Sequence, residues 1–307
     1  MITGALLSAA ALGTAVYIAG EIYMRSDFSG KFTGMHEGLA RVDSAPAGDI
    51  EGRELVSLDL TGGSGIEVEA FLTVPAGADR KLPAVIILGG LRTGRRTVEY
   101  LREVPGIAVL AMDYPYEGKR EGLGTLEFIR AVPAIRRSIL ETVPAVMLGV
   151  DYLASREDID EEKIILVGGS LGALFVPAAA GSDRRIDAAA ILFGGCDIAA
   201  LVRHGFDGPA WLGRVAGWAA SALLAPVEPA RWTGRISPRP VFILSAEGDE
   251  LIPAACSRGL HEKAGEPRTI RWIDTGHLDI RSEEFHRVVV EMLLEWMESN
   301  RLVPDGG

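Results

Sequence analysis

Five short and almost wholly apolar runs constrain the fold of this chain more than any other feature of its sequence. The runs are Ala84–Leu88, Ile107–Met112, Ile164–Val167, Ala188–Phe193 and Val241–Leu244, and Thr269–Ile273 is a weaker sixth that Arg271 interrupts. A continuous apolar run of this length is typical of a strand that is buried on both faces, as in a parallel sheet. Helical stretches alternate with these runs, so we expect a doubly wound α/β domain with helices on both faces of a mostly parallel sheet.

Helices and connections complete the predicted outline. Helical spacing covers Leu126–Leu153, with breaks expected near Pro133 and Pro144, and it also covers Leu171–Ala180 and Glu283–Ser299. The runs Glu54–Leu60 and Ile66–Val74 are predicted to form an N-terminal antiparallel hairpin around a glycine-rich turn, at one edge of the sheet. Residues 25–52 are expected to be a linker and residues 53–300 one α/β domain. Residues 197–238 are too many for a simple crossover, so a cap-like helical insertion is predicted there.

Composition excludes several classes of function. The chain of 307 residues has a net charge of −11 and shows no basic stripe with interleaved aromatic side chains, which argues against a nucleic-acid partner. Its two cysteines, Cys196 and Cys256, cannot build a disulfide framework and have no metal-binding spacing. We expect both to be buried small apolar side chains, and no metal site is predicted.

The amino terminus differs from the rest of the chain because residues Ile2 to Gly20 carry no charge. As a helix, this stretch would be about 28 Å long, close to the thickness of the hydrocarbon core of a bilayer. Residues 1–24 are therefore predicted to be a membrane anchor, and the positive charges of Arg25, Lys31 and Arg41 slightly favour a cytoplasmic catalytic body. A cleaved signal peptide, which would make the protein secreted, and a helix packed on the protein itself or on a partner stay open as alternatives.

The segment Gly168-Gly169-Ser170-Leu171-Gly172 lies between a predicted buried strand and a predicted helix. This is the Gly-x-Ser-x-Gly pattern of a nucleophile elbow, in which the serine hydroxyl is exposed on a strained strand-to-helix turn. Glycines two residues on either side let the strand and the helix approach each other without Cβ clashes. An ordinary glycine turn and a phosphate-binding loop are the alternatives, and the second lacks the spacing that such loops need.

A nucleophilic serine needs a base, and the base needs an acid that orients it. Of the five histidines, only His277 closely follows a predicted core strand. Three carboxylates follow the strand before it, in Glu247-Gly248-Asp249-Glu250, and Asp249 comes directly after the glycine that turns the loop. Asp197, after the preceding strand, is the rival acid. The order Ser170, Asp249, His277 is the order of an α/β hydrolase rather than that of chymotrypsin or subtilisin.

Residues 82–300 resemble the α/β-hydrolase superfamily, and within it dienelactone hydrolase and the prolyl-oligopeptidase-like esterases. The resemblance rests on residues 158–160, on Ile165-Leu-Val-Gly-Gly-Ser170-Leu-Gly172, on residues 236–253 and on Gly276-His277. It implies that Asp249 is the acid of a Ser-His-Asp triad and that no cofactor is needed. It also implies an oxyanion hole formed by the backbone N–H groups of Leu91 and Leu171, with Gly90 allowing close approach, although the family's His-Gly-Gly motif here lacks its histidine. Tyr114 is a further candidate there, with a packing role as the alternative.

The expected function is hydrolysis of a carboxylic ester through an acyl-enzyme, on a small-molecule substrate. A peptidase or amidase of the same fold, and a non-catalytic membrane-tethered binding protein, are the alternatives. The predicted insertion contains Trp211 and Trp218, which could line an apolar substrate pocket or could simply pack the insertion onto the domain.

Overall fold

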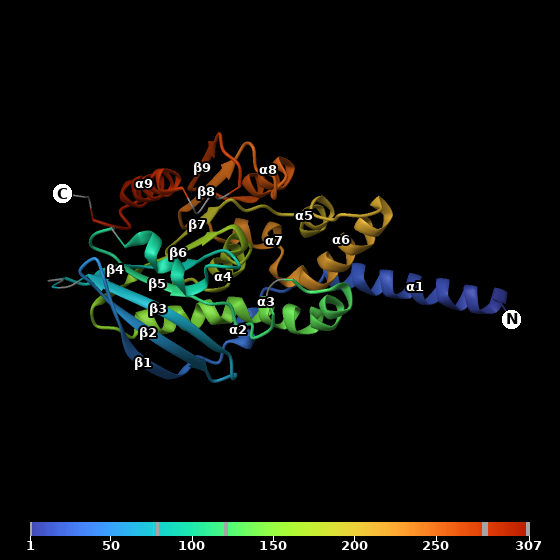
Figure 1. Cartoon of the computed structure of the whole chain (residues 1–307), viewed down its shortest axis with the longest axis horizontal. Coiled ribbons are helices and arrows are strands. Elements are labelled where there is room, and N and C mark those ends of the chain that lie inside the picture. The colour runs from blue at the N-terminus through green and yellow to red at the C-terminus, as the bar shows by residue number, and fades with distance from the viewer. Residues whose placement is uncertain are drawn as a thin grey trace.

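The computed structural model describes residues 2–75, 77, 80–102, 104–119, 122–277 and 282–304, with the side chains given from residue 11 onward. A nine-stranded sheet with the order β1-β2-β3-β5-β4-β6-β7-β8-β9 crosses the molecule (Figure 1). From β5 to β9 all neighbouring strands are parallel, whereas β1, β2, β3 and β5 pair in antiparallel fashion. This is the predicted doubly wound sheet with an antiparallel hairpin at one edge.

The predicted apolar runs form the strands of the sheet. The strands are β1 (Leu39–Ile50), β2 (Arg53–Gly62), β3 (Glu67–Pro75), β4 (Leu82–Leu88), β5 (Ala108–Met112), β6 (Ile159–Gly169), β7 (Ala188–Leu192), β8 (Val241–Ala246) and β9 (Arg268–Ile273). Every residue of β4, β5, β7 and β8 is buried, as expected for strands covered on both faces.

Helices cover both faces of the sheet. The α-helices are α1 (Ile2–Met24), α2 (Lys31–Met35), α3 (Thr125–Ala154), α4 (Val176–Ser182), α5 (Ile198–His204), α6 (Ala210–Leu224), α7 (Pro229–Trp232), α8 (Ala254–Lys263) and α9 (Glu283–Ser299). The 3₁₀ helices are η1 (Gly94–Leu101), η2 (Ser170–Leu174), η3 (Ala225–Val227) and η4 (Thr233–Arg235). One apolar core joins the sheet to α3 and α4, and a second joins the opposite face to η1 and α9.

Residues 25–52, predicted to be a linker, are part of the domain instead. They contain α2 and β1, and β1 pairs with β2 along most of its length. Nine of the twelve residues of β1 are exposed, so this strand is held by backbone hydrogen bonds and lacks the alternation of apolar side chains that would reveal it in the sequence. Phe32 of α2 is fully buried against Trp232, which anchors the segment to the core.

The expected breaks in the long helix are absent. Helix α3 runs continuously through Pro133 and Pro144. A proline inside a helix removes one backbone hydrogen bond. Pro144 lies in the second half of α3, which is almost wholly buried against the sheet, and we attribute the unbroken helix at Pro144 to this packing.

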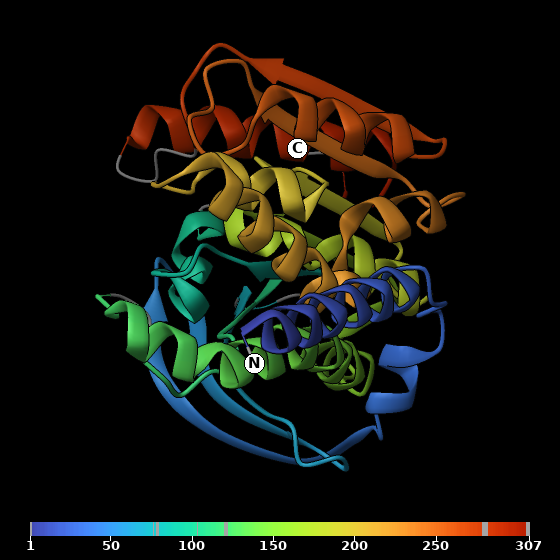
Figure 2. The same cartoon turned by 90° about the vertical axis from the view of Figure 1, so that its right-hand side faces the viewer.

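The membrane anchor predicted for residues 1–24 is not supported, because no helix among the described residues is both long and apolar enough to cross a bilayer. The segment forms α1, and its C-terminal part packs on α6 of the predicted helical insertion (Figure 2). The Trp218 ring stacks on Tyr17, and its indole N–H donates to the Glu21 carboxylate at 3.1 Å. Gly20 allows this contact, since a Cβ there would lie 2.4 Å from the Trp218 ring.

Candidate active site

Ser170 stands at the carboxyl end of β6, at the point where the chain turns into the 3₁₀ helix η2. Its φ of 54° is in the left-handed region, which is strained for a residue with a side chain. Helix α4 begins only at Val176, so the helix predicted from Leu171 is a 3₁₀ turn followed by a short α-helix. The strained turn is the conformation that the Gly-x-Ser-x-Gly pattern predicts.

The two glycines of the pattern lie in contact with backbone. A Cβ on Gly172 would lie 2.1 Å from the carbonyl oxygen of Leu88, and a Cβ on Gly168 would lie 2.6 Å from the carbonyl carbon of Gly172. The absence of side chains therefore lets the turn pack against the end of β4. Leu88 also pairs with Gly168 in the parallel sheet, so the loop of residues 89–91 starts next to the turn that contains Ser170.

We expect Gly172→Ala to destabilise the fold by about 3 kcal/mol, because the new methyl group would overlap the Leu88 carbonyl and neither backbone segment is free to move away. Urea denaturation followed by circular dichroism measures this loss. Gly90→Ala is the matched control, since a Cβ there meets nothing within 4 Å. A Gly172→Ala protein as stable as the Gly90→Ala protein would contradict the proposed close contact.

His277 and Asp249 lie beside the serine, although Ser170 and His277 are 107 positions apart in the sequence. The Ser170 Oγ lies 2.8 Å from the Nε2 of His277, and the His277 Nδ1 lies 2.9 Å from both carboxylate oxygens of Asp249. The side chains of His277 and Asp249 are only 9% and 3% exposed, so little water competes for these hydrogen bonds. The structure thus joins the three predicted residues in one hydrogen-bonded chain.

The proton positions in this chain follow from the chemistry of its partners. An ionised carboxylate only accepts hydrogen bonds. The Nδ1 of His277 therefore carries a hydrogen and donates a hydrogen bond to Asp249. In a neutral ring the Nε2 is then free to accept the Ser170 hydroxyl proton. The backbone N–H groups of Leu251 and Ile252 donate to Asp249 Oδ1 at 2.9 and 2.8 Å and fix the orientation of the carboxylate.

The rival acid, Asp197, has a different role. It precedes α5 with a φ of 67°, and its carboxylate accepts the backbone N–H of Ala200 at 2.9 Å. Its own N–H donates to the Glu228 carboxylate at 2.9 Å. Asp197 is therefore an N-cap that starts a helix of the insertion, and no hydrogen bond joins it to His277 in the described part of the chain.

Glu250, one of the three carboxylates that follow β8, is a functional candidate that the sequence analysis did not single out. Its carboxylate accepts the backbone N–H of His277 at 2.9 Å, and this hydrogen bond lowers the pKa of Glu250 below its ordinary value. Its carbonyl oxygen lies 2.9 Å from the His204 Nε2. Glu250 thus ties the loop of the acid to the loop of the histidine. Its place directly after Asp249 is the only sequence signal for this role.

Tyr114 supports the loop of residues 89–91, which contains Leu91, one of the two predicted oxyanion donors. The buried Tyr114 packs on Phe175, and its hydroxyl donates a hydrogen bond to the Gly89 carbonyl oxygen. Its polar group therefore supports the loop that contains Gly90 and Leu91. Leu171, the second predicted donor residue, directly follows the serine in η2.

The two tryptophans of the insertion lie on α6. Trp218 lines an apolar groove of about 700 Å³ between α1, α3 and α6, and Trp211 is 65% exposed. Their part in substrate binding stays a prediction. Cys196 and Cys256 are buried free thiols, as expected, and burial raises their pKa values to about 12 and about 11. The described residues contain no group of three or more histidine, cysteine or acidic side chains that could hold a metal ion.

Comparison with known proteins concerns the fold in which these residues lie. No family model and no curated protein matches the sequence. The structure is similar to an acetyl xylan esterase from Paenibacillus sp. R4, with a TM-score of 0.67 and 19% identity over 87% of this chain and 92% of the other. It is also similar to acetyl xylan esterase 1 from Thermoanaerobacterium sp. JW/SL YS485, with a TM-score of 0.67 and 16% identity over 88% and 94% of the two chains.

A third similar structure carries the fold in its name. It is the α/β hydrolase GrgF from Penicillium sp. sh18, with a TM-score of 0.56 and 15% identity over 84% of this chain and 99% of the other. At these identities the likeness concerns the fold, and it agrees with the sheet order and with the strand–turn–helix around Ser170. The chain therefore has the α/β-hydrolase fold that its sequence motifs predicted.

Proposed function

We propose that this protein hydrolyses carboxylic esters of small molecules through an acyl-enzyme formed on Ser170. The observation that carries the proposal is the hydrogen-bonded chain from Ser170 through His277 to Asp249, which ends at a serine held on a strained turn. The esterase neighbours support an ester as the substrate, since the two acetyl xylan esterases share the fold over most of both chains.

In the proposed reaction the Ser170 oxygen attacks the ester carbonyl carbon while its proton passes to the His277 Nε2. The carbon–oxygen bond to the alcohol then breaks, and the alcohol leaves with the proton from His277. Water attacks the acyl-enzyme in the same way, with His277 as base, and releases the acid and the free serine. Asp249 holds the imidazole ring and stabilises the positive charge that develops on it.

The carbonyl oxygen of the substrate becomes negative in each tetrahedral intermediate and needs hydrogen-bond donors. We assign this task to the backbone N–H groups of Leu91 and Leu171, on the two segments that meet where Gly172 touches Leu88. Because Tyr114 supports the first of these segments through Gly89, the donors are positioned before the substrate binds.

A fluorophosphonate probe tests the proposal because it reacts with serines that an adjacent base activates. We expect the probe to label the protein on Ser170, as located by peptide mass spectrometry, and p-nitrophenyl acetate to be hydrolysed. Pre-treatment with the probe should abolish that hydrolysis. A protein that is neither labelled nor active would exclude a serine esterase and would favour a binding protein on the same fold.

Glu250→Ala should lower kcat about tenfold and leave KM nearly unchanged, because the His277 backbone loses its hydrogen-bond partner and the ring drifts from the serine. Glu250→Gln keeps a carbonyl oxygen as acceptor and should restore kcat to within about threefold. Since the folded-state pKa of Glu250 is lowered, this hydrogen bond is charge-assisted above that pKa and weakens as the pH falls through it.

Glu247→Ala is the control for this prediction, because its exposed side chain lies in the same loop without a side-chain hydrogen bond among the described residues. Steady-state kinetics with p-nitrophenyl acetate measures all three variants. If Glu250→Ala and Glu247→Ala had equal kcat values, Glu250 would have no positioning role.

A further inference from the structure

Exposed apolar side chains gather at one end of the molecule. Fourteen large apolar side chains are exposed among the described residues, and five of these lie on α1, three on α3 and four on α6. Figure 1 shows α1 projecting from the body of the protein, and Figure 2 shows α3 and α6 beside it. We call this surface, made of residues 11–24, 125–136 and 210–224, the apolar end. An exposed apolar surface of this extent normally marks an interaction site.

Two of these helices are exposed around their whole circumference. Residues 11–19 of α1 are all exposed, and so are residues 125–130 of α3, so consecutive side chains on every side of each helix meet solvent. The apolar groove of about 700 Å³ lies between them and α6. A flat protein partner covers only one side of a projecting helix, whereas the acyl chains of lipids can surround it.

The arginines of the apolar end lack acidic partners. Arg130 and Arg214 are exposed and form no ion pair with any residue that the structure describes. Arg136 donates to two neutral groups, the Leu223 carbonyl oxygen at 3.0 Å and the Tyr23 hydroxyl at 3.2 Å. Each of these three helix positions therefore keeps its positive charge.

The acidic side chains of the apolar end, in contrast, are paired with cations. Glu21 lies 3.7 Å from Arg25, and Glu127 lies 3.9 Å from Lys119. The unpaired charges on this surface are therefore all positive, although the chain as a whole has a net charge of −11. This charge pattern favours a negatively charged partner.

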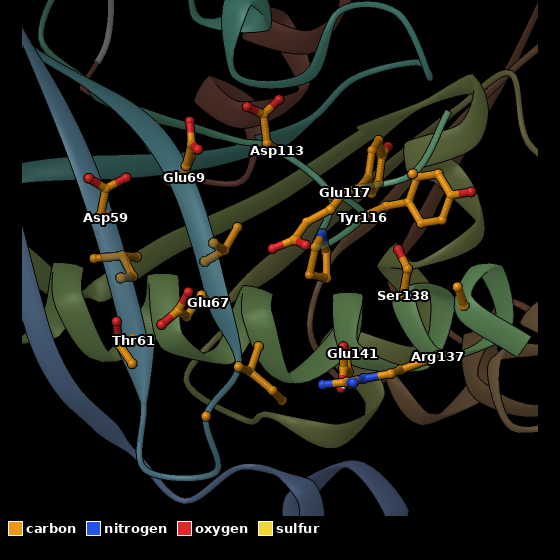
Figure 3. Close-up of a pocket in the computed structure, with 18 of the residues that line it drawn as sticks. Asp59, Thr61, Glu67, Glu69, Asp113, Tyr116, Glu117, Arg137, Ser138 and Glu141 are labelled. Atoms are coloured by element: carbon orange, nitrogen blue, oxygen red, sulfur yellow. The ribbon is translucent and has the colours of Figure 1, made fainter. Parts of the chain in front are cut away.

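The negative charge of the protein is concentrated on another face. A depression of about 740 Å³ between β2, β3, the loop after β5 and α3 is lined, among the described residues, by seven carboxylates and two arginines. Figure 3 shows Asp59, Glu67 and Glu69 on the two strands. Ser138 lines this depression from α3, whereas Arg136, on a different face of the same helix, lines the apolar groove. The molecule is thus polarised, with a cationic apolar end and an acidic flank.

From these observations we infer that the apolar end docks on the surface of a bilayer that contains anionic lipids. Its apolar side chains enter one leaflet, and Arg130 and Arg214 meet the negative headgroups. Tyr17 and Trp211 are exposed there, and such aromatic side chains favour the boundary between lipid and water. This docking needs no helix that crosses the bilayer, since the apolar side chains reach only about 5–10 Å into the leaflet.

A second copy of the chain fits this surface less well. The same patch on both copies would meet in a symmetric contact, which would bring the unpaired arginines of the two chains together. Like charges placed opposite each other weaken an interface. Anionic headgroups, in contrast, neutralise these arginines while the acyl chains cover the apolar side chains.

Co-sedimentation of the full chain with sucrose-loaded vesicles tests this inference. Vesicles of phosphatidylcholine with about 30% phosphatidylserine should bind the protein, and pure phosphatidylcholine vesicles should bind it at least about fivefold more weakly, because they lack anionic headgroups. Raising sodium chloride from about 50 to about 500 mM should reduce this difference, since salt screens the charges. Ser170→Ala should bind like the wild type, which separates the surface from the proposed esterase activity.

The double variant Phe128→Ser with Ile129→Ser tests the apolar contribution. Both side chains are exposed on the first turns of α3, so the melting temperature should stay that of the wild type. Binding to the anionic vesicles should fall at least about tenfold, because two large apolar side chains no longer enter the leaflet.

Arg130→Gln tests the electrostatic contribution and should weaken binding to the anionic vesicles about fivefold. Arg184→Gln is the matched control, because Arg184 is equally exposed but lies outside the apolar end. Its neighbour Arg185 pairs with Asp151, near the opposite end of α3. Arg184→Gln should change the affinity less than about twofold.

Three results would overturn the inference. They are the absence of saturable binding to the anionic vesicles, an equal loss in Arg130→Gln and Arg184→Gln, and a stable dimer in sedimentation equilibrium that binds no vesicles and that the double variant dissociates. The second would indicate a diffuse effect of charge, and the third would indicate that a second copy covers the apolar end.

Discussion

Ser170→Ala is expected to lower kcat for p-nitrophenyl acetate on the order of 10⁵-fold, and to abolish labelling by a fluorophosphonate, with the fold intact. The Ser170 oxygen is the atom proposed to form the acyl-enzyme, and an alanine methyl group at the same φ of 54° offers no nucleophile. The histidine and the acid cannot act without it, so the whole contribution of the three residues is lost together. Active-site titration and thermal melting of the purified variant measure both parts of this prediction.

Ser182→Ala is the control for the loss of a serine hydroxyl. The Ser182 Oγ is buried near the end of α4 and has no hydrogen-bond partner among the described residues, so its removal should leave activity and labelling unchanged. Hydrolysis by a homogeneous Ser170→Ala protein at more than a few per cent of the wild-type rate would rule out the proposed acyl-enzyme.

Asp249→Asn is expected to lower kcat about 10⁴-fold, whereas Asp197→Asn should stay within about threefold of the wild type. The asparagine amide would donate a hydrogen bond to the His277 Nδ1, so the proton would move to Nε2. The ring could then no longer accept the Ser170 proton. Asparagine at position 197 keeps an oxygen for the Ala200 N–H and tolerates the positive φ, so α5 should still begin there.

The two variants make a matched pair because each replaces one carboxylate oxygen with an amide nitrogen. Steady-state rates together with a pH profile from about 5 to about 9 distinguish them, since only the first variant should change the ionisation that controls kcat. If Asp197→Asn were the inactive protein, the acid of the triad would be Asp197, which follows β7, and the hydrogen bonds of Asp249 would have only a structural role.

Much of the fold could be predicted because its signals are local. Each buried strand from β4 to β8 has a continuous apolar run, and the turn at Ser170 has glycines where contacts leave no room for a Cβ. Strand β1 could not be predicted, since its residues are mostly exposed and backbone pairing with β2 holds it in place. The continuity of α3 through Pro144 likewise depends on the sheet against which this half of the helix packs.

The candidate site also has one part that the sequence predicts and one part that only the structure reveals. Residue types and their places after predicted strands were enough to select Ser170 and His277 as candidates, and they narrowed the choice of the acid to a few carboxylates at loop positions. The sequence could not decide between Asp249 and Asp197 from its pattern alone, because both follow a core strand and both can reach a neighbouring loop. Only the folded chain shows that Asp249 faces the imidazole while Asp197 caps a helix.

Contacts between distant segments were decided by the tertiary structure alone. The hydrogen bond from the His277 backbone to Glu250 and the packing of α1 on Trp218 each join parts of the chain that share no local sequence pattern. The spacing of apolar residues determines which face of its own strand or helix a side chain occupies, and this face could be predicted from the sequence. Which elements then lie side by side depends on how the sheet is assembled, and no single stretch of sequence contains that information.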